Sequence, residues 1–222
     1  MRLLLVRHGN TFEAGQTPVR VGANEDMPLT AAGEGQAHAL ADALKKTSIR
    51  PGLFVCGPLK RTQRHTEILM TDLGASETAE VDPRLTEIDY GPWGGLSDPE
   101  IIDRFGPAAA RELDAWEKES RWPTETAQWL PGADTVRRDI KNLTADLSAR
   151  LGADDTALIC SSNGILRYFL DLTSEGLAGH QAAGNAKMAT GAASLLDITN
   201  GHVRIRFWNV KAGTALPDAQ ER

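Results

Sequence analysis

Residues 1–11 read MRLLLVRHGNT, and this stretch decides the fold. The apolar run Leu3–Val6 is typical of a buried β-strand. Arg7 and His8 follow at the end of that strand, where open α/β sheets place their ligands and reactive groups. A planar guanidinium binds phosphate oxygens in pairs and a neutral imidazole is a nucleophile, so the two residues suit a phosphoryl group. Gly9 leaves the backbone room to approach such a ligand.

The remainder of the chain alternates between helical and extended patterns. Apolar residues recur at helical spacing in several segments, and Thr30 is a suitable N-cap for the first of them. Helices are expected at residues 32–46, 59–73 and 134–151, and from Ile165 onward. Strands are expected at residues 3–6, 53–56, 79–81, 157–160, 192–198 and 203–208, the last two as a hairpin. The alternation predicts an α/β fold, a three-layer α/β/α sandwich with a central, mostly parallel sheet.

Residues 88–132 depart from this alternation. They hold four of the five tryptophans, and stretches such as GPWGGLSDPE and RWPTE interrupt regular structure. We expect a partly helical insertion over the site, in which the tryptophans form either the apolar walls of a pocket or the insertion's own core. Residues 1–210 are otherwise expected to form a single domain, and residues 211–222 a flexible C-terminal tail.

Composition limits the classes of partner. The 222 residues carry a net charge of -6, which argues against nucleic acid, although a local group of cations is enough to hold a small anion. Cys56 and Cys160 are too few for a disulfide framework and lack metal-ligand spacing, so we expect no metal, no cofactor and a cytoplasmic protein. No run approaches the roughly 20 apolar residues that span a bilayer, so no membrane partner is expected.

Five stretches carry a family resemblance: LLLVRHGNT, VGANEDMPLTAAGEGQA, CGPLKRTQRHTE, LTEIDYGPWGG and ICSSNGILR. In this order, over residues 3–167, the chain resembles the histidine phosphatase superfamily, the phosphoglycerate-mutase-like proteins. The resemblance implies that His8 is the nucleophile that becomes phosphohistidine. It also implies that Arg7 and Arg61 bind the phosphoryl group and that Glu87 protonates the leaving group.

The implied roles are chemically consistent. Phosphoryl transfer needs in-line placement and neutralisation of the charge on the equatorial oxygens, and two arginines provide both. An alkoxide leaving group needs a proton, which a carboxyl group supplies when burial or nearby negative charge keeps it protonated. We expect the aromatic segment around Trp93 to bury Glu87 in this way.

One position departs from the family pattern in a way that affects catalysis. The superfamily's second histidine lies in a Ser-His-Gly triplet, which here reads Ser162-Asn163-Gly164. The amide of Asn163 still donates a hydrogen bond to the phosphoryl group, but without a charge, so we expect weaker catalysis. Gly164 is placed with the phosphate-binding residues.

Three further residues are candidates for phosphate binding. Asn10 stands where the family has Glu or Gln and either donates to phosphate or caps the loop, and Thr11 matches the family's hydroxyl. His65 lies four residues after Arg61, on the same face of the expected helix. Its imidazole either contacts the ligand in the pocket, or is exposed to solvent or lies behind the residues that line the pocket.

The resemblance leaves three reactions to compare. The segment DYGPWGGLSDPE is shorter and more acidic than the corresponding segment of the glycolytic mutases, so we favour a metal-independent phosphomonoester phosphatase that acts on a small phosphorylated metabolite. The alternatives are a catalytically weak phospho-ligand-binding protein and a phosphoglycerate-mutase-type phosphomutase. The oligomeric state, homodimer included, is left open.

Overall fold

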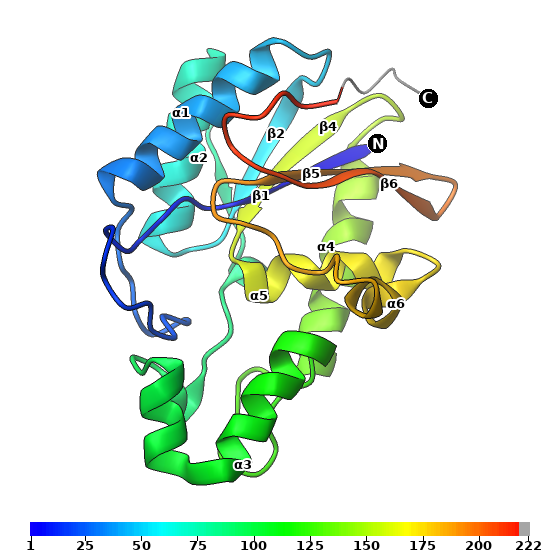
Figure 1. Cartoon of the computed structure of the whole chain (residues 1–222). Coiled ribbons are helices and arrows are strands. Elements are labelled where there is room, and N and C mark those ends of the chain that lie inside the picture. Colours follow the sequence, from blue (N-terminus) through cyan, green and yellow to red (C-terminus); the bar gives the residue numbers. More distant parts are fainter. Residues whose placement is uncertain (218–222) are drawn as a thin grey trace.

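A six-stranded sheet lies at the centre of the computed structural model, which describes residues 1–217 (Figure 1). The strand order is β3-β2-β4-β1-β5-β6; the first four strands are parallel, and β5 and β6 are antiparallel to their neighbours. The mostly parallel sheet of the sequence analysis is confirmed. The strands are β1 (Arg2–Arg7), β2 (Pro51–Cys56), β3 (Glu80–Val81), β4 (Thr156–Ser161), β5 (Ala193–Thr199) and β6 (His202–Val210).

Helices cover both faces of the sheet and so complete the three layers (Figure 1). Two helices, α1 (Ala31–Lys45) and α2 (Lys60–Leu73), pack together on one face. The other face carries α4 (Ala133–Arg150), α5 (Asn163–Leu166) and α6 (Gly176–Ala182), whereas α3 (Asp98–Glu119) extends beyond the sheet. Single turns of 3-10 helix lie at η1 (Pro83–Leu85) and η2 (Gly91–Trp93), and a longer one at η3 (Arg167–Leu172).

The continuous apolar run of β1 follows from its position between β4 and β5. Side chains of a strand alternate between the two faces of a sheet. Leu3 and Leu5 therefore join the core beneath α4, whereas Leu4 and Val6 join the core beneath α1 and α2. All four are fully buried, and truncation of one such leucine to alanine typically costs about 2–5 kcal/mol of stability. This packing fixes the strand that delivers Arg7 to the site.

The tryptophans of the insertion pack on one another and join the same core as Leu3 and Leu5 of β1. Trp129 contacts the rings of Tyr90, Trp93, Trp116 and Trp122, with centroids 4.8–5.5 Å apart and mostly edge-to-face. Such pairs add about 0.5–1.5 kcal/mol each beyond the area they bury. The insertion is therefore rigid enough to form a fixed wall of a neighbouring cavity.

Two segments differ from the sequence-based expectation. The helix expected from Ile165 is α-helical only through α5, and it tightens to 3-10 geometry in η3. The C-terminal tail is not free at its start, since Leu216 is buried in the core beneath α1 and α2. Its last residues, 218–222, lie outside the described part of the chain. The hairpin is as expected, with Asn200 and Gly201 at φ of 51° and 78°.

Candidate active site

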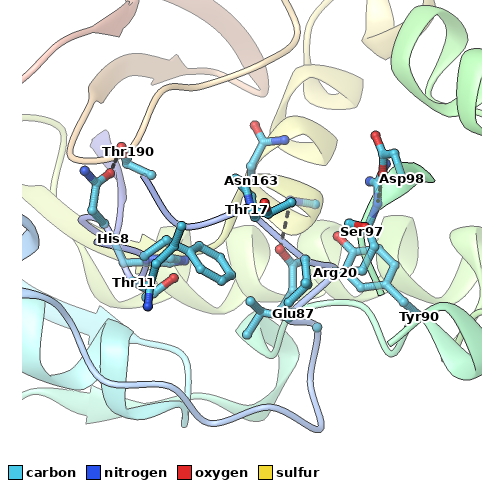
Figure 2. Close-up of a pocket in the computed structure, with 18 of the residues that line it drawn as sticks. His8, Thr11, Thr17, Arg20, Glu87, Tyr90, Ser97, Asp98, Asn163 and Thr190 are labelled. Carbon is cyan, nitrogen blue, oxygen red and sulfur yellow. Dashed lines mark hydrogen bonds and ion pairs between the residues drawn. The ribbon is translucent and has the colours of Figure 1, made fainter. Parts of the chain in front are cut away.

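The carboxyl ends of β1 and β4 form one wall of a cavity of about 910 Å³. The two strands pair in parallel, so His8 and Asn163 follow them at the same edge of the sheet. Arg61 from the first turn of α2 and Glu87 from the loop after η1 line the same cavity. Figure 2 shows the cavity reaching from His8 to Asp98 at the start of α3.

The imidazole of His8 is buried and held in one tautomer. Its Nδ1 lies 2.8 Å from the backbone oxygen of Gly9. A carbonyl only accepts hydrogen bonds, so Nδ1 carries the ring proton and Nε2 keeps its lone pair. Burial, followed by the positive charges of Arg61 and Arg7, lowers the pKa of His8 well below its usual value of 6.5. The ring is therefore neutral at pH 7, with Nε2 facing the cavity.

Close backbone packing fixes the loop that carries His8. A Cβ on Gly9 would collide with the backbone of Gly33 in α1, and a Cβ on Gly33 would collide with the backbone of Asn10. Thr30 caps α1 by accepting from the N–H of Gly33 at 3.1 Å, and its hydroxyl donates to the backbone oxygen of Asn10. The loop after β1 is thereby held against the N-terminus of α1.

His65 lies behind this loop and does not line the cavity. Its side chain is completely buried, and its Nδ1 accepts a hydrogen bond from the N–H of Gly9 at 3.1 Å. Burial lowers the pKa of His65 to about 3, so this ring is also neutral. The placement corrects the hypothesis that His65 contacts phosphate, because α2 turns Arg61 toward the cavity and His65 toward the loop backbone.

The two arginines of the motifs have no carboxylate partner. Arg7 donates from Nη1 to the backbone oxygen of Met188, and Arg61 donates from Nη1 and Nη2 to the backbone oxygens of Glu25 and Gly22, both at 2.8 Å. Neither guanidinium forms an ion pair with any residue from 1 to 217. Burial lowers the pKa of both, yet a guanidinium stays charged in proteins. Glu87 offsets only part of this positive charge, so the cavity attracts an anion.

Glu87 is buried at the same cavity and held by backbone donors. Its Oε1 accepts from the N–H of Ile88 at 2.9 Å, and its Oε2 accepts from the N–H of Gly164 at 3.3 Å. A Cβ on Gly164 would collide with the Glu87 carboxylate. The glycine is thus required by the carboxylate, and its N–H is directed at Glu87 rather than at a phosphate.

Asn163 uses its side-chain oxygen within the protein. Oδ1 accepts from the N–H of Met188 at 2.8 Å, and the carbonyl of the same Met188 accepts from Arg7. The amide orientation is thereby fixed, and the NH₂ group has no hydrogen-bond partner among the described residues. Asn163 lines the cavity, and its NH₂ group is not used by the protein within residues 1–217.

Asn10 and Thr11 both line the cavity. The side-chain oxygen of Asn10 accepts from the hydroxyl of Thr190, and its backbone N–H donates to Gln36 at 2.8 Å. Asn10 thus links the loop after β1 to the segment before β5, and only its NH₂ group is left for a ligand. Thr11 is buried, and its hydroxyl has no hydrogen-bond partner within residues 1–217.

A third buried arginine, Arg167, also lines the cavity, although the sequence alone predicted no role for it. It follows Asn163 by four residues, and Nε donates to the backbone oxygen of Asn163 at 3.4 Å. Its guanidinium carbon lies 4.0 Å from the ring centroid of Trp116. The signal for Arg167 was a charged residue inside the apolar run ILRYFL, and such a residue needs a partner or a ligand.

Residues 1–217 contain no group of three or more His, Cys, Asp or Glu side chains arranged to hold a metal ion. None of the helices in that range has the length and apolar character needed to cross a bilayer. The positive charge at the cavity is supplied by guanidinium groups of this chain.

The comparison with protein families decides the assignment: the model of the histidine phosphatase superfamily (branch 1) matches residues 3–211. The chain belongs to this superfamily. The chain is similar in fold to the mycobacterial glucosyl-3-phosphoglycerate phosphatase, whose structure was solved in complex with inorganic phosphate. That likeness has a TM-score of 0.76 and 25% identity and covers 96% of this chain and 99% of the other.

Two curated members of the superfamily differ in their reactions. A 2,3-bisphosphoglycerate-dependent phosphoglycerate mutase of a Methylobacterium species is 26% identical over 182 residues, which is 80% of this chain and 84% of the mutase. The glucosyl-3-phosphoglycerate phosphatase of Mycolicibacterium vanbaalenii is 33% identical over 122 residues, which is 54% of this chain. The match spans about half of that phosphatase, 49%. The superfamily is therefore established, and the choice between the two reactions rests on the site.

Proposed function

We propose that this protein is a phosphomonoester phosphatase that works through a phosphohistidine on His8. The observation that carries the proposal is a neutral, buried imidazole facing a cavity in which Arg7 and Arg61 are charged and have no carboxylate partner. A phosphoryl dianion supplies the missing negative charge. The guanidinium groups supply the positive charge that metal ions supply in other phosphoryl-transfer enzymes, so activity is expected to survive chelators.

The first half-reaction forms a nitrogen–phosphorus bond and breaks the ester bond. The lone pair on Nε2 of His8 attacks phosphorus, and the alcohol oxygen leaves on the opposite side. Glu87, at the same cavity and in its protonated form, gives the leaving oxygen its proton and becomes a carboxylate. Arg7, Arg61 and the NH₂ group of Asn163 hold the three equatorial oxygens, where charge develops.

The second half-reaction restores the enzyme. The Glu87 carboxylate removes a proton from water, the water oxygen bonds to phosphorus, and the bond to Nε2 of His8 breaks. Inorganic phosphate leaves, and both side chains return to their starting states. A mutase would pass the phosphoryl group to a second substrate hydroxyl instead; the short, acidic segment after Glu87 supports water as the acceptor.

The test is capture of the intermediate. The protein is mixed with an aryl phosphate and quenched, and acid-labile phosphate is measured on His8 together with free inorganic phosphate. We expect both in the wild type and neither in His8→Ala. Phosphate release that persists in His8→Ala would contradict the proposal, and transfer to an added alcohol without phosphate release would indicate a mutase.

A binding-only protein is the second candidate, because a neutral amide stands where the superfamily has an imidazole. Asn163→His tests it. If the amide is a deficit, the variant forms phosphohistidine faster than the wild type. If neither the wild type nor the variant labels His8 while both bind phosphate, the protein is a phospho-ligand binder.

We also infer that the protein works in a reducing compartment such as the cytoplasm. The inference is supported by Cys56 and Cys160, which are Cα partners on β2 and β4 and are nevertheless unbridged.

A further inference from the structure

The third guanidinium of the cavity, on Arg167, has no carboxylate within ion-pair distance, although the charges of Glu87 and Glu117 act on it from further away. Arg167 is 2% exposed and forms no ion pair with residues 1–217. Its polar contacts are neutral: Nη1 donates to the hydroxyl of Ser120 at 2.9 Å, and Nε donates to a backbone oxygen. Nη2 has no protein partner in that range. Removing one cation from water without a paired anion costs several kcal/mol, so this position calls for a ligand.

The other cations on the distal side of the cavity are already neutralised. Arg20 is paired with Asp98 at 2.8 Å, and Lys187 is paired with Glu117 at 2.6 Å. Each of these four residues lines the cavity. A ligand group that reaches this side therefore meets a single unpaired cation, Arg167.

Arg167 lies on the side of the cavity next to the insertion, within electrostatic reach of Arg7. The charges that lower the pKa of His8 most are those of Arg61 and Arg7. Arg167 is instead held against the insertion, on the ring of Trp116 and beside Ser120 at the end of α3. Its position is set by α3 and by η3, not by the β1 loop.

The cavity has room for a substituent between the two positions. A volume of about 910 Å³ is that of a site for a metabolite-sized ligand, much larger than a phosphoryl group needs. It reaches from His8 and Thr190 to Tyr90 and Asp98 (Figure 2). The side of the cavity next to Arg167 therefore has room for the alcohol part of a substrate.

We propose that Arg167 determines specificity by binding a second anionic group, carboxylate or phosphate, on the alcohol part of the substrate. This rests on the proposed phosphatase function. The substrate class is then a phosphomonoester that carries a second acidic group, and an aryl or alkyl phosphate without one is a poor ligand.

Binding to the His8→Ala protein tests the proposal without turnover. Calorimetry compares the 2-, 3- and 4-carboxyphenyl phosphates with the matching carbamoylphenyl phosphates, which have the same shape without the charge. For at least one isomer we expect the carboxylate to bind at least tenfold more tightly. In His8→Ala/Arg167→Met this affinity ratio falls to near one.

Arg137→Met is the matched control in the same background, because Arg137 also lies over an aromatic ring, that of Tyr168, but pairs with Asp171 outside the cavity. The ratio should be retained there. If Arg167→Met does not fold, Arg167→Gln keeps a donor toward Ser120 and serves in its place.

The proposal would be overturned if His8→Ala bound the carboxyphenyl and carbamoylphenyl phosphates equally well for every isomer. It would also be overturned if the preference for the carboxylate remained in His8→Ala/Arg167→Met. Failure of the phosphatase function is a different result. In that case wild type forms no phosphohistidine, whatever the affinity ratio.

Discussion

At the scale of single residues, the site depends on glycines that admit neighbouring polar groups. Gly164 is the clearest case, because its N–H donates to Glu87 and its missing side chain leaves room for the carboxylate. Gly9 and Gly33 play the same part for the loop of His8. These positions tolerate no Cβ, so the sequence keeps glycine where the chemistry needs close backbone approach.

Gly164→Ala is expected to displace the Glu87 carboxylate and to lower kcat by about 10²-fold or more, the order of effect seen when a catalytic proton-transfer group is lost. Phosphate affinity should change less, because the arginines are unaffected. Steady-state kinetics with an aryl phosphate measures both. Gly35→Ala is the control, since a Cβ there meets nothing within 4 Å in α1. Equal activity of the Gly164 and Gly35 variants would contradict the argument.

His65 provides a second residue-scale prediction. Its folded pKa of about 3 lies below the unfolded value near 6.5, so the unfolded chain binds one more proton as the pH falls. The stability contributed by the neutral ring is complete above pH 6.5 and is lost as the pH falls toward 3.

The variant His65→Gln keeps a side-chain oxygen that accepts from the N–H of Gly9, but it has no ring to protonate. It therefore removes the pH-dependent contribution of His65 to stability. Between pH 6 and 5, the free energy of unfolding should fall less steeply in the variant, by about 1 kcal/mol per pH unit. Urea titrations over this range measure the slope. Parallel curves for wild type and variant would show that His65 is not kept neutral by burial.

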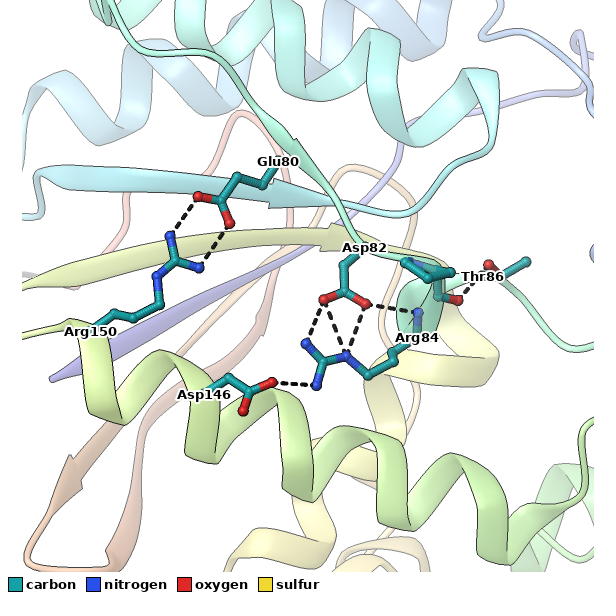
Figure 3. Close-up of polar contacts among 7 residues, drawn as sticks. Glu80, Asp82, Arg84, Thr86, Asp146 and Arg150 are labelled. Carbon is teal, nitrogen blue, oxygen red and sulfur yellow. Dashed lines mark hydrogen bonds and ion pairs between the residues drawn. The ribbon is translucent and has the colours of Figure 1, made fainter.

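At the scale of elements, an ion-pair network positions the segment before Glu87 (Figure 3). Arg84 of η1 contacts Asp82 through Nη2 at 2.7 Å and Asp146 of α4 through Nη1 at 2.6 Å. A second pair, Arg150 with Glu80, joins α4 to β3 but is more exposed. The loop that carries the proposed acid is thus fastened to α4.

Arg84→Met is expected to lower the free energy of unfolding by about 1 kcal/mol and kcat several-fold, because a partly buried network is lost and the Glu87 loop loosens. Arg150→Met, the exposed counterpart, should cost at most about 0.5 kcal/mol and leave kcat unchanged. Denaturant titration and kinetics measure the two effects. A larger loss for Arg150→Met would mean that the network does not position Glu87.

The sequence predicted well the elements whose pattern is local. The strands of the sheet and helices α1, α2 and α4 end within about two residues of their expected bounds, because apolar periodicity and caps such as Thr30 specify them. The insertion was predicted only as partly helical. Its helix α3 bends at Gly106, φ 76°, before Pro107, and aromatic contacts across the whole insertion stabilise it.

The site residues that lie in sequence motifs were predicted correctly. Residues whose position depends on packing between distant elements were not. Arg7, His8, Arg61 and Glu87 line one cavity as the resemblance implied. The direction of His65 depends on how α2 is rotated against the β1 loop, which no local pattern specifies. The contact of Arg167 with Trp116 depends on a residue 51 positions earlier in the chain.

At the scale of the whole molecule, two parts of the fold meet at the cavity. The carboxyl edge of the sheet, where a mostly parallel sheet places reactive groups, supplies Arg7 and the proposed nucleophile His8, and the first turn of α2 adds Arg61. The insertion supplies Trp116 and Tyr90 to the opposite wall. The proposed phosphoryl chemistry at the sheet and the proposed recognition of the alcohol part beside α3 thus share a single cavity.

The central claim is that His8 is neutral and fixed with its Nδ1 proton directed at Gly9. The most direct test is the position of the phosphoryl group on the trapped ring, read from the ³¹P spectrum and the hydrolysis rate of the labelled protein. We expect phosphate on Nε2 of His8 alone. Phosphate on Nδ1, or on another residue, would contradict the account.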